Sequence, residues 1–313
     1  MILFLFRFIA LWVFATFAVT GLTFVLRFYE QAAKDAASGI RHKPDLQSIS
    51  ALLGAWARES GMNLGHVVMW ISAVLPRPRI RSGAWIPVQG EVRHGLPVLL
   101  VPGYGMNRGC LRLLARRLEA THRPVLAIDF PWGKTIEELA ELLAAAAQEL
   151  RAATGSEKID VVAHSRGGIV AAWWVQKQGG SAYVERLVTL GSPWSGTKIA
   201  AFGIGPSVLQ LFPASALLRA LSAVPLDPRV VFYAVNGETD AMMLPPGTDE
   251  IPAPGRNIRL AGVGHMGLLL SVSAFQQVYA ALRRKVEDEA KIAGFDDEST
   301  EDAADRALAQ FGR

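Results

Sequence analysis

The chain has 313 residues, of which 51% are hydrophobic, and its formal net charge is +4. This apolar content excludes disorder for most of the chain, and the mixed composition excludes a collagen-like architecture. The single cysteine, Cys110, excludes an intrachain disulfide and a zinc site built on cysteines. We expect Cys110 to be a small buried hydrophobe.

The N-terminus carries the longest uncharged stretch. Residues 8–26 contain no charged side chain, and as a helix they would extend about 28 Å, close to the hydrocarbon thickness of a bilayer. We predict that residues 1–29 form a transmembrane anchor. A cleaved signal peptide is the rival interpretation, although no A-x-A pattern follows the run. A buried core helix is disfavoured because the run shows no polar face.

More basic residues follow the anchor than precede it. Arg7 is the basic side chain on the N-terminal side, and the other side offers Arg27, Lys34, Arg41 and Lys43. The positive-inside rule therefore favours a single-pass protein of a bacterial inner membrane, with a cytoplasmic rather than a periplasmic body.

Residues 30–94 are interpreted as a connecting or docking region. Leu46 to Trp56 has helical spacing, and the apolar run from Val67 to Leu75 is too short to span a membrane. We expect the second run to be a docking or interfacial helix. Three arginines at 77, 79 and 81 suit either a contact with anionic lipid or a solvated loop. They lack the interleaved aromatics of a nucleic-acid site, so no nucleic-acid partner is expected.

From residue 95 onward, short β-rich runs alternate with helical stretches. We expect strands at 98–101, 125–128, 159–163, 187–190, 230–235 and 258–261. The capping box from Thr135 to Glu138 predicts the start of a long helix. Repeated β-α units indicate an α/β fold with a mostly parallel sheet and helices on both faces. Functional residues in such sheets gather in the loops at the carboxyl ends of the strands.

The predicted strand at 159–163 ends in a tight turn with Ser165 at its apex, and a helix follows. The turn needs small residues two positions before and after the serine, and Ala163 and Gly167 occupy them. This A-x-S-x-G pattern is a variant of the G-x-S-x-G nucleophile elbow. We predict that Ser165 is a nucleophile, and the alternative is a helix N-cap.

A serine nucleophile needs a base, and the base needs an orienting acid. In the elbow architecture the chain order is serine, acid, histidine. Of the six histidines only His265 lies beyond Ser165, in a glycine-rich loop between a predicted strand and a helix. We therefore predict His265 as the base, with a capping or core role as the alternative.

The acid must lie between the serine and the histidine. The candidates are Glu185, Asp227, Glu238, Asp240, Asp249 and Glu250. The first two precede their strands, which is the wrong end of the sheet, and the last two lie in a proline-rich stretch. Asp240 and Glu238 both follow the strand at 230–235. We choose Asp240, with Glu238 as the fallback.

The oxyanion formed during acyl attack needs backbone N–H donors. We predict that Arg166, which follows the nucleophile, and Tyr104, in the loop after the first strand, supply them. Neither G-x-G-x-x-G nor G-x-x-x-x-G-K-[ST] occurs in the loop 102–107, so a phosphate cradle is not expected there. We expect neither a cofactor nor a metal ion.

Four segments carry a family resemblance: Pro102–Gly105, Asp160–Gly168, Leu190–Thr197 and Gly262–Leu269. On these segments the chain resembles the α/β-hydrolase superfamily, and specifically small bacterial lipases and esterases of the Bacillus type. The resemblance covers about residues 95–285. It implies the same elbow serine, an acid after the penultimate strand and the same histidine.

The chain departs from the family pattern at two places. Pro102 and Gly103 stand where the family usually has His-Gly, and Arg166 replaces the commoner Met or Gln. Since the oxyanion donors are backbone groups, neither change should abolish the chemistry. The Arg166 side chain could, however, reach an acidic leaving group.

Two further segments complete the predicted organisation. Residues 192–229 form an apolar connection longer than an α/β fold needs, and we interpret it as a cap over the active site, with ordinary helix packing on the sheet as the equal alternative. Residues 286–313 hold nine acidic and three basic residues, a net charge of −6, and are interpreted as a solvated acidic tail. The rest of the chain then carries +10.

These observations predict a membrane-held serine esterase or lipase that acts on apolar acyl esters through an acyl-enzyme. One alternative keeps the acyl-enzyme but transfers the acyl group to an alcohol or amine. A third hypothesis, from another class, is a non-catalytic membrane scaffold on a hydrolase fold.

Overall fold

A computed structural model describes residues 2–38, 46–74 and 95–283. The predicted acidic tail at 286–313 and the arginine cluster at 77–81 lie outside these residues.

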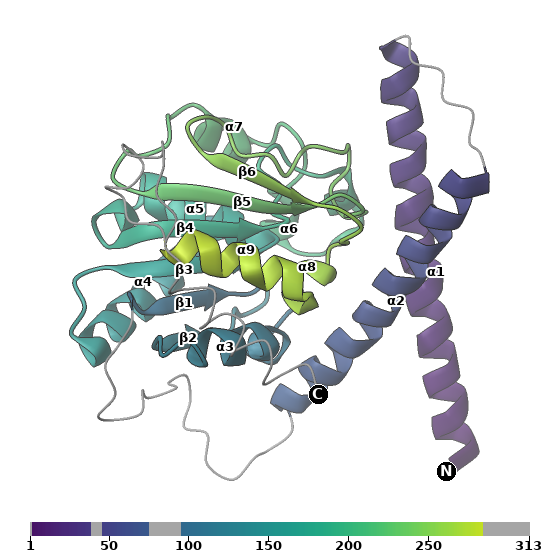
Figure 1. Cartoon of the computed structure of the whole chain (residues 1–313), viewed down its shortest axis with the longest axis horizontal. Coiled ribbons are helices and arrows are strands. Elements are labelled where there is room, and N and C mark those ends of the chain that lie inside the picture. Colours follow the sequence, from purple (N-terminus) through teal and green to yellow (C-terminus); the bar gives the residue numbers. More distant parts are fainter. Residues whose placement is uncertain (1, 39–45, 75–94, 284–313) are drawn as a thin grey trace, which may run out of the picture.

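The centre of the molecule is a sheet of six parallel strands in the order β2-β1-β3-β4-β5-β6 (Figure 1). The strands are β1 (Val98–Val101), β2 (Val125–Ala127), β3 (Ile159–His164), β4 (Val184–Leu190), β5 (Val231–Gly237) and β6 (Arg256–Leu260). β1, β2 and β3 are buried along their whole length, as expected for strands covered on both faces. The predicted α/β-hydrolase fold with a mostly parallel sheet is confirmed.

Helices cover both faces of the sheet. The helices α4 (Ile136–Thr154) and α5 (Arg166–Lys177) pack on the face that holds Leu99 and Val161. The helices α3 (Arg112–Glu119) and α9 (Val272–Arg283) pack on the opposite face, against Leu100 and Val162. Successive side chains of a strand point to opposite faces, so one short β1 strand anchors two separate apolar cores.

The helix start predicted at Thr135 appears in the structure. Thr135 and Glu138 form the capping box that opens α4. Asn107 caps the short helix η1 (Arg108–Leu111), which leads into α3. After β6 the chain forms two helices, α8 (Gly267–Leu270) and α9, which are separate because Ser271 adopts an extended conformation between them.

The segment 192–229 contains η3 (Lys198–Phe202), α6 (Pro206–Leu209) and α7 (Ala216–Ser222). Its buried side chains join the core beside α4 and α5: Ala200, Val208, Leu211, Leu217, Leu218, Leu221 and Leu226. Most of the apolar content that suggested a cap is therefore packed into the core. Phe202 and Ile204 remain mostly exposed at its outer edge.

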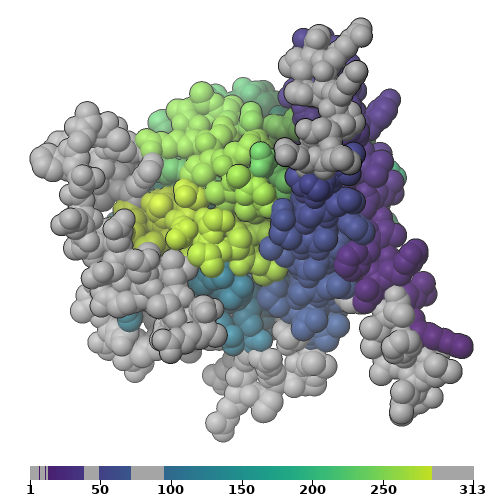
Figure 2. Space-filling model, turned by 45° about the vertical axis from the view of Figure 1, so that its right-hand side comes forward, coloured from purple at the N-terminus to yellow at the C-terminus, as the bar shows by residue number. Residues whose placement is uncertain are grey.

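The N-terminal part of the chain forms two long helices, α1 (Ile2–Ala37) and α2 (Leu46–Val74), which cross beside the sheet domain (Figure 1). Figure 2 shows α2, in blue, against the yellow-green C-terminal part of the body, with α1, in purple, on the far side of α2. Trp56 fastens the pair, because its indole N–H donates to the Phe17 carbonyl at 3.1 Å and its ring meets the Phe17 ring edge-on. The two separate apolar segments expected in 46–75 belong to one continuous helix.

The helix α1 has a polar face that the sequence analysis missed. Thr16, Thr20, Thr23 and Arg27 recur at helical spacing and lie toward α2 and the sheet domain. The amide of Asn63 on α2 donates to the Thr20 hydroxyl at 3.1 Å. The stretch Val13–Ala37 is long and apolar enough to cross a membrane by length and composition, and a signal sequence would pass the same test.

Candidate active site

Ser165 occupies a strained turn between β3 and α5. Its φ of 54° and ψ of −125° lie outside the regions that side-chain-bearing residues favour. A Cβ at Gly167 would lie 2.6 Å from the Pro102 carbonyl oxygen, so only glycine fits where the backbone doubles back. Ser165 stands at the N-cap position of α5, yet its side chain makes no capping hydrogen bond. This geometry is that of a nucleophile elbow.

Asp240 and His265 are brought together from two loops at the carboxyl edge of the sheet. Asp240 follows β5, His265 lies between β6 and α8, and the Nδ1–H of the imidazole donates to Asp240 Oδ2 at 2.7 Å. Asp240 is fully buried and His265 is 7% exposed. Asp240 Oδ1 also accepts the N–H of Met242 at 2.9 Å, which fixes the carboxylate. With Nδ1 protonated, the other ring nitrogen of His265 is the one that can accept a proton.

The fallback acid, Glu238, has a different position. Its carboxylate accepts the N–H of Gly262 at 3.0 Å and does not pair with His265. The other predicted candidates form ion pairs elsewhere: Glu185 with Lys158, Asp227 with Arg229, and both Asp249 and Glu250 with Arg259. Among the six candidates, Asp240 is the one placed to orient the imidazole.

Glycine is also required beside the Asp240–His265 pair. Gly191 ends β4 with a φ of +52°, and a Cβ there would lie 2.7 Å from Asp240 Oδ2 and 3.2 Å from His265 Nδ1. In the sequence, Gly191 belongs to the segment Leu190–Thr197 of the family resemblance, and no local pattern indicates a role for it. The structure gives it one, because any side chain would displace the acid or the base.

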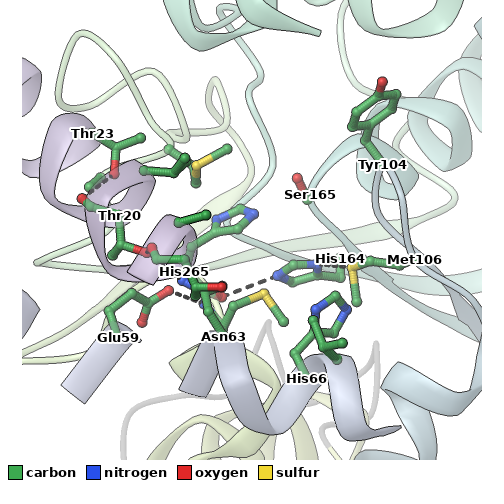
Figure 3. Close-up of a pocket in the computed structure, with 17 residues that line it drawn as sticks. Thr20, Thr23, Glu59, Asn63, His66, Tyr104, Met106, His164, Ser165 and His265 are labelled. Atoms are coloured by element: carbon green, nitrogen blue, oxygen red, sulfur yellow. Dashed lines mark hydrogen bonds between the residues drawn. The ribbon is translucent and has the colours of Figure 1, made fainter. Parts of the chain in front are cut away.

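Ser165 and His265 both line one cavity (Figure 3). In the described part of the chain no hydrogen bond joins the Ser165 hydroxyl to the imidazole. Catalytic hydrogen bonds are often long or misaligned without substrate and tighten in the Michaelis complex. The three predicted residues Ser165, Asp240 and His265 therefore share one site, with the serine and the base still apart.

The predicted oxyanion donors are the N–H groups of Arg166, which follows Ser165 in the chain, and of Tyr104, in the loop after β1. Within the described residues, no acceptor is assigned to the backbone N–H of Tyr104 or of Arg166. A Cβ at Gly103 would lie 3.1 Å from the Ser165 Cβ, so glycine lets the Tyr104 loop approach the nucleophile closely. Two unpaired N–H groups beside a nucleophile suit a developing oxyanion.

The Arg166 side chain does not face the cavity, contrary to the expectation that it could reach a leaving group. It is buried, and it donates to the Ser207 hydroxyl at 2.9 Å and to the Gly103 carbonyl at 3.4 Å. Burial lowers the pKa of its guanidinium to about 10. Arg166 therefore braces the loop before Tyr104.

The pKa values of two histidines at the site are shifted in opposite directions. Burial is the largest single influence on the pKa of His265 and lowers it, but the charge and hydrogen bond of Asp240, together with the charges of Glu59 and Asp249, raise that pKa above its ordinary value. Burial and the nearby His265 lower the pKa of His164 well below its ordinary value. His164 Nε2 donates to the His265 carbonyl at 3.2 Å, so a neutral His164 supports the loop of the base.

The cavity has a volume of about 470 Å³ and is enclosed on one side by α1 and α2. Its lining residues are Ala15, Thr16, Val19, Thr20, Thr23, Glu59, Asn63, His66, Val67, Tyr104, Met106, His164, Ser165, Ala241, Met242, His265 and Met266. None of these lies in 192–229, the segment expected to form a cap. The helices α1 and α2, rather than the segment 192–229, cover the cavity.

Sequence analysis missed the polar side chains that α1 and α2 contribute. Glu59, Asn63 and His66 follow helical spacing on α2 and face the catalytic residues (Figure 3). On α1, Arg27 donates to the main-chain carbonyls of Asp240 at 2.8 Å and of Glu238 at 2.5 Å. The available signal was the polar periodicity within otherwise apolar helices.

Over residues 2–38, 46–74 and 95–283, no group of three or more histidine, cysteine or acidic side chains could hold a metal ion. The arrangement offers a serine hydroxyl in the same cavity as a buried histidine with its acid, and two backbone donors. These parts suit acyl transfer from an ester to the serine.

A family model described as the alpha/beta hydrolase family matches residues 98–310. Among solved structures, a mature Bacillus licheniformis lipase, BlEst2, is 17% identical with a TM-score of 0.55, covering 63% of this chain and 95% of that one. Aspergillus fumigatus lipase B is 19% identical with a TM-score of 0.56, and the match covers 66% of this chain and 56% of the lipase. Legionella pneumophila phospholipase PlaB is 14% identical with a TM-score of 0.51, and the match covers 69% of this chain and 65% of the phospholipase. At these identities the similarity concerns the fold.

Proposed function

Because the chain belongs to the alpha/beta hydrolase family, we propose that it is a serine carboxylic-ester hydrolase acting on apolar acyl esters. The observation that carries the proposal is the buried 2.7 Å hydrogen bond between His265 and Asp240, in the same cavity as the strained Ser165. A histidine oriented by an acid beside an elbow serine is the arrangement that acyl-enzyme chemistry requires.

In the first half of the reaction, the Ser165 hydroxyl attacks the ester carbonyl and its proton passes to the free ring nitrogen of His265. Asp240 stabilises the resulting imidazolium, and the N–H groups of Tyr104 and Arg166 stabilise the oxyanion. The tetrahedral intermediate collapses, His265 returns the proton to the leaving alcohol, and the acyl group stays on Ser165. Water then attacks the acyl-enzyme by the same route and releases the carboxylic acid and the serine.

The cavity supports an apolar substrate. Ala15, Val19, Val67, Met106 and Met242 line much of it, and its volume lies in the range of small-molecule sites. Two of the structural neighbours are named lipases and a third a phospholipase. These observations favour acyl esters with a hydrocarbon chain, including lipid esters.

The membrane part of the proposal depends on the outer side of α1. Leu11, Phe14, Leu22 and Val25 recur at helical spacing and are each more than half exposed. This apolar stripe suits lipid, whereas the polar face of α1 is turned toward the site. We infer that α1 holds the hydrolase at a bacterial inner membrane, with the cytoplasmic orientation that the flanking basic residues favour.

The catalytic proposal is tested with Ser165→Ala and p-nitrophenyl esters of increasing chain length. Hydrolysis by the full-length protein should fall to background in this variant, and a fluorophosphonate should label the wild type but not the variant. Ser273→Ala changes a serine exposed on α9 and should behave as wild type. Undiminished turnover by Ser165→Ala would overturn the assignment. Unlabelled, inactive wild-type protein would instead support the scaffold hypothesis, and an acyl product on an added alcohol or amine would support acyl transfer.

The membrane proposal is tested separately. Replacing Leu22 and Val25 with serine should move the protein from the membrane fraction to the soluble fraction, whereas Lys34→Ala, an exposed change on the same helix, should not. Retention of the doubly substituted protein in the membrane would argue against this surface as the attachment.

A further inference from the structure

Glu59 connects α2 to the loop that carries the catalytic histidine. Its carboxylate is 5% exposed, and its Oε1 accepts the backbone N–H of Met266, next to His265, at 2.6 Å. The two residues are 207 positions apart in the chain. Nothing in the acyl-transfer steps above uses this carboxylate.

Gly264, the other chain neighbour of His265, also lies against Glu59. A Cβ at Gly264 would lie 2.7 Å from the Glu59 carboxyl carbon and closer still to one of its oxygens. Gly264 therefore leaves room for the carboxylate, and Met266 donates to it. His265 therefore lies between two residues that both fit around Glu59.

A buried carboxylate costs stability unless its environment compensates. Burial raises the pKa of Glu59 to about 7, while the hydrogen bond from Met266 and the nearby His265 favour its charged form. In turn, the charge of Glu59 favours protonated His265, adding to the larger effect of Asp240. A residue that served only to attach α2 would not need a charge at this place.

We propose that Glu59 is a positioning residue of the catalytic site, which holds the His265 loop through Met266 and stabilises the imidazolium formed when Ser165 attacks. The inference rests on the proposed hydrolase function. On this proposal α2 contributes a side chain to the active site, although α2 lies outside the sheet domain.

Other titratable groups act on His265 and stay in place in a Glu59 variant. Asp240 and Asp249 favour the imidazolium, and His164 and His66 disfavour it when charged. Removing the Glu59 charge should therefore lower the pKa of His265 without abolishing the effect of Asp240. The shift is expected to be about one pH unit, because opposite charges at close range shift a pKa by at least this much.

The experiment compares Glu59→Gln and Glu59→Ala with wild type in the full chain. Glutamine keeps an oxygen for the Met266 N–H but removes the charge, whereas alanine removes both. Glu119→Gln is the matched control, because Glu119 is a partly buried carboxylate with a raised pKa on α3 that does not line the cavity. Two quantities are measured: the His265 ring titration by NMR, and kcat and KM for p-nitrophenyl butyrate.

We expect His265 to titrate about one pH unit lower in Glu59→Gln, with the control unchanged. In Glu59→Ala, kcat should fall about 10- to 100-fold at unchanged KM in folded protein, because misplacing a catalytic group by about 1 Å costs up to 10²-fold. An unchanged His265 titration in Glu59→Gln, or wild-type kcat in Glu59→Ala, would overturn the proposal. A wild type without ester turnover would refute the hydrolase function instead, and the NMR titration would still decide the link between Glu59 and His265.

Discussion

The guanidinium of Arg27 donates to the main-chain carbonyl of Asp240 at 2.8 Å, although the two residues are 213 positions apart. The same guanidinium reaches the carbonyls of Glu238 and Met243, so three residues of the acid loop meet one side chain of α1. A charged donor that satisfies carbonyls in a half-buried place contributes more than a neutral one. The helix α1, predicted as an anchor, therefore also fixes the loop of Asp240, the proposed catalytic acid.

Arg27→Ala should impair catalysis while leaving the fold intact. Losing hydrogen bonds from a charged donor costs about 1.5–3 kcal/mol, and a loosened Asp240 loop should lower kcat/KM by about 10- to 100-fold. Ester hydrolysis with circular dichroism as a check on folding measures the effect. Lys34→Ala removes an exposed positive charge from the same helix and should leave kcat/KM unchanged. Equal activity of the two variants would show that the Arg27 contacts do not matter for catalysis.

Deleting residues 1–29 should abolish most of the activity, beyond the loss in Arg27→Ala. The deletion removes Thr16, Thr20 and Thr23 from the cavity wall and exposes the face of α2 that packs against α1. Ester hydrolysis by the truncated and full-length proteins tests this. A truncated protein with wild-type kcat/KM would be the result expected of a removable signal peptide, and it would contradict the role given to α1.

Asp240→Asn should lower kcat far more than Glu238→Gln. An amide in place of Asp240 no longer holds the Nδ1–H tautomer or stabilises the imidazolium, a loss on the order of 10⁴-fold in comparable sites. In Glu238→Gln the amide oxygen can still accept the Gly262 N–H, so kcat should change little. Steady-state kinetics on both proteins decide between the two acids, and the reverse ranking would reassign the acid to Glu238.

The sheet domain was largely predictable because its signals are local. The runs that end in Val101, Ala163 and Val235 are short, apolar and bounded by turns, which is the pattern of buried parallel strands. The order of Ser165, Asp240 and His265 along the chain followed from the elbow pattern. Each of these signals lies within a few residues of the element that it defines.

The role of α1 and α2 was not predictable in the same way. A contact such as Arg27 with Asp240, or Glu59 with Met266, joins residues more than 200 positions apart, and no local pattern encodes it. The uncharged run 8–26 gave a strong hydropathy signal that concealed the threonine face. The apolar side chains of 192–229 likewise fit either a cap over a site or packing into the core, because both environments favour apolar residues. The sequence therefore did not distinguish the two.

Gly191→Ala should lower both the stability of the protein and its kcat, whereas an unfavourable backbone conformation alone should lower only the stability. Alanine at a φ of +52° costs about 1–2 kcal/mol, and its Cβ would also press against Asp240 and His265. Gly133→Ala is the matched control, because Gly133 has a φ of +78° with no atom within 4 Å of the added Cβ. Chemical unfolding should show a loss of stability in both proteins, and kcat should fall only in Gly191→Ala. Unchanged kcat in Gly191→Ala would mean that the acid–base pair tolerates the displacement.

The pH dependence of catalysis should follow the raised pKa of His265. Burial lowers that pKa, but Asp240, together with Glu59 and Asp249, raises it further, so the imidazole loses its proton above the ordinary value of about 6.5. Because the base must be neutral, the acid limb of kcat/KM should lie above this value, and in Asp240→Asn it should move below it.

The raised pKa of His265 also makes the stability of the protein depend on pH, in a definite direction. A raised folded-state pKa stabilises the protein fully below the unfolded pKa, and this contribution disappears as pH rises through the folded pKa. Unfolding free energies across that window should therefore decline more in the wild type than in His265→Gln, which cannot titrate. An acid limb below the ordinary histidine value in the wild type would contradict the assignment of Asp240 as the group that controls the base.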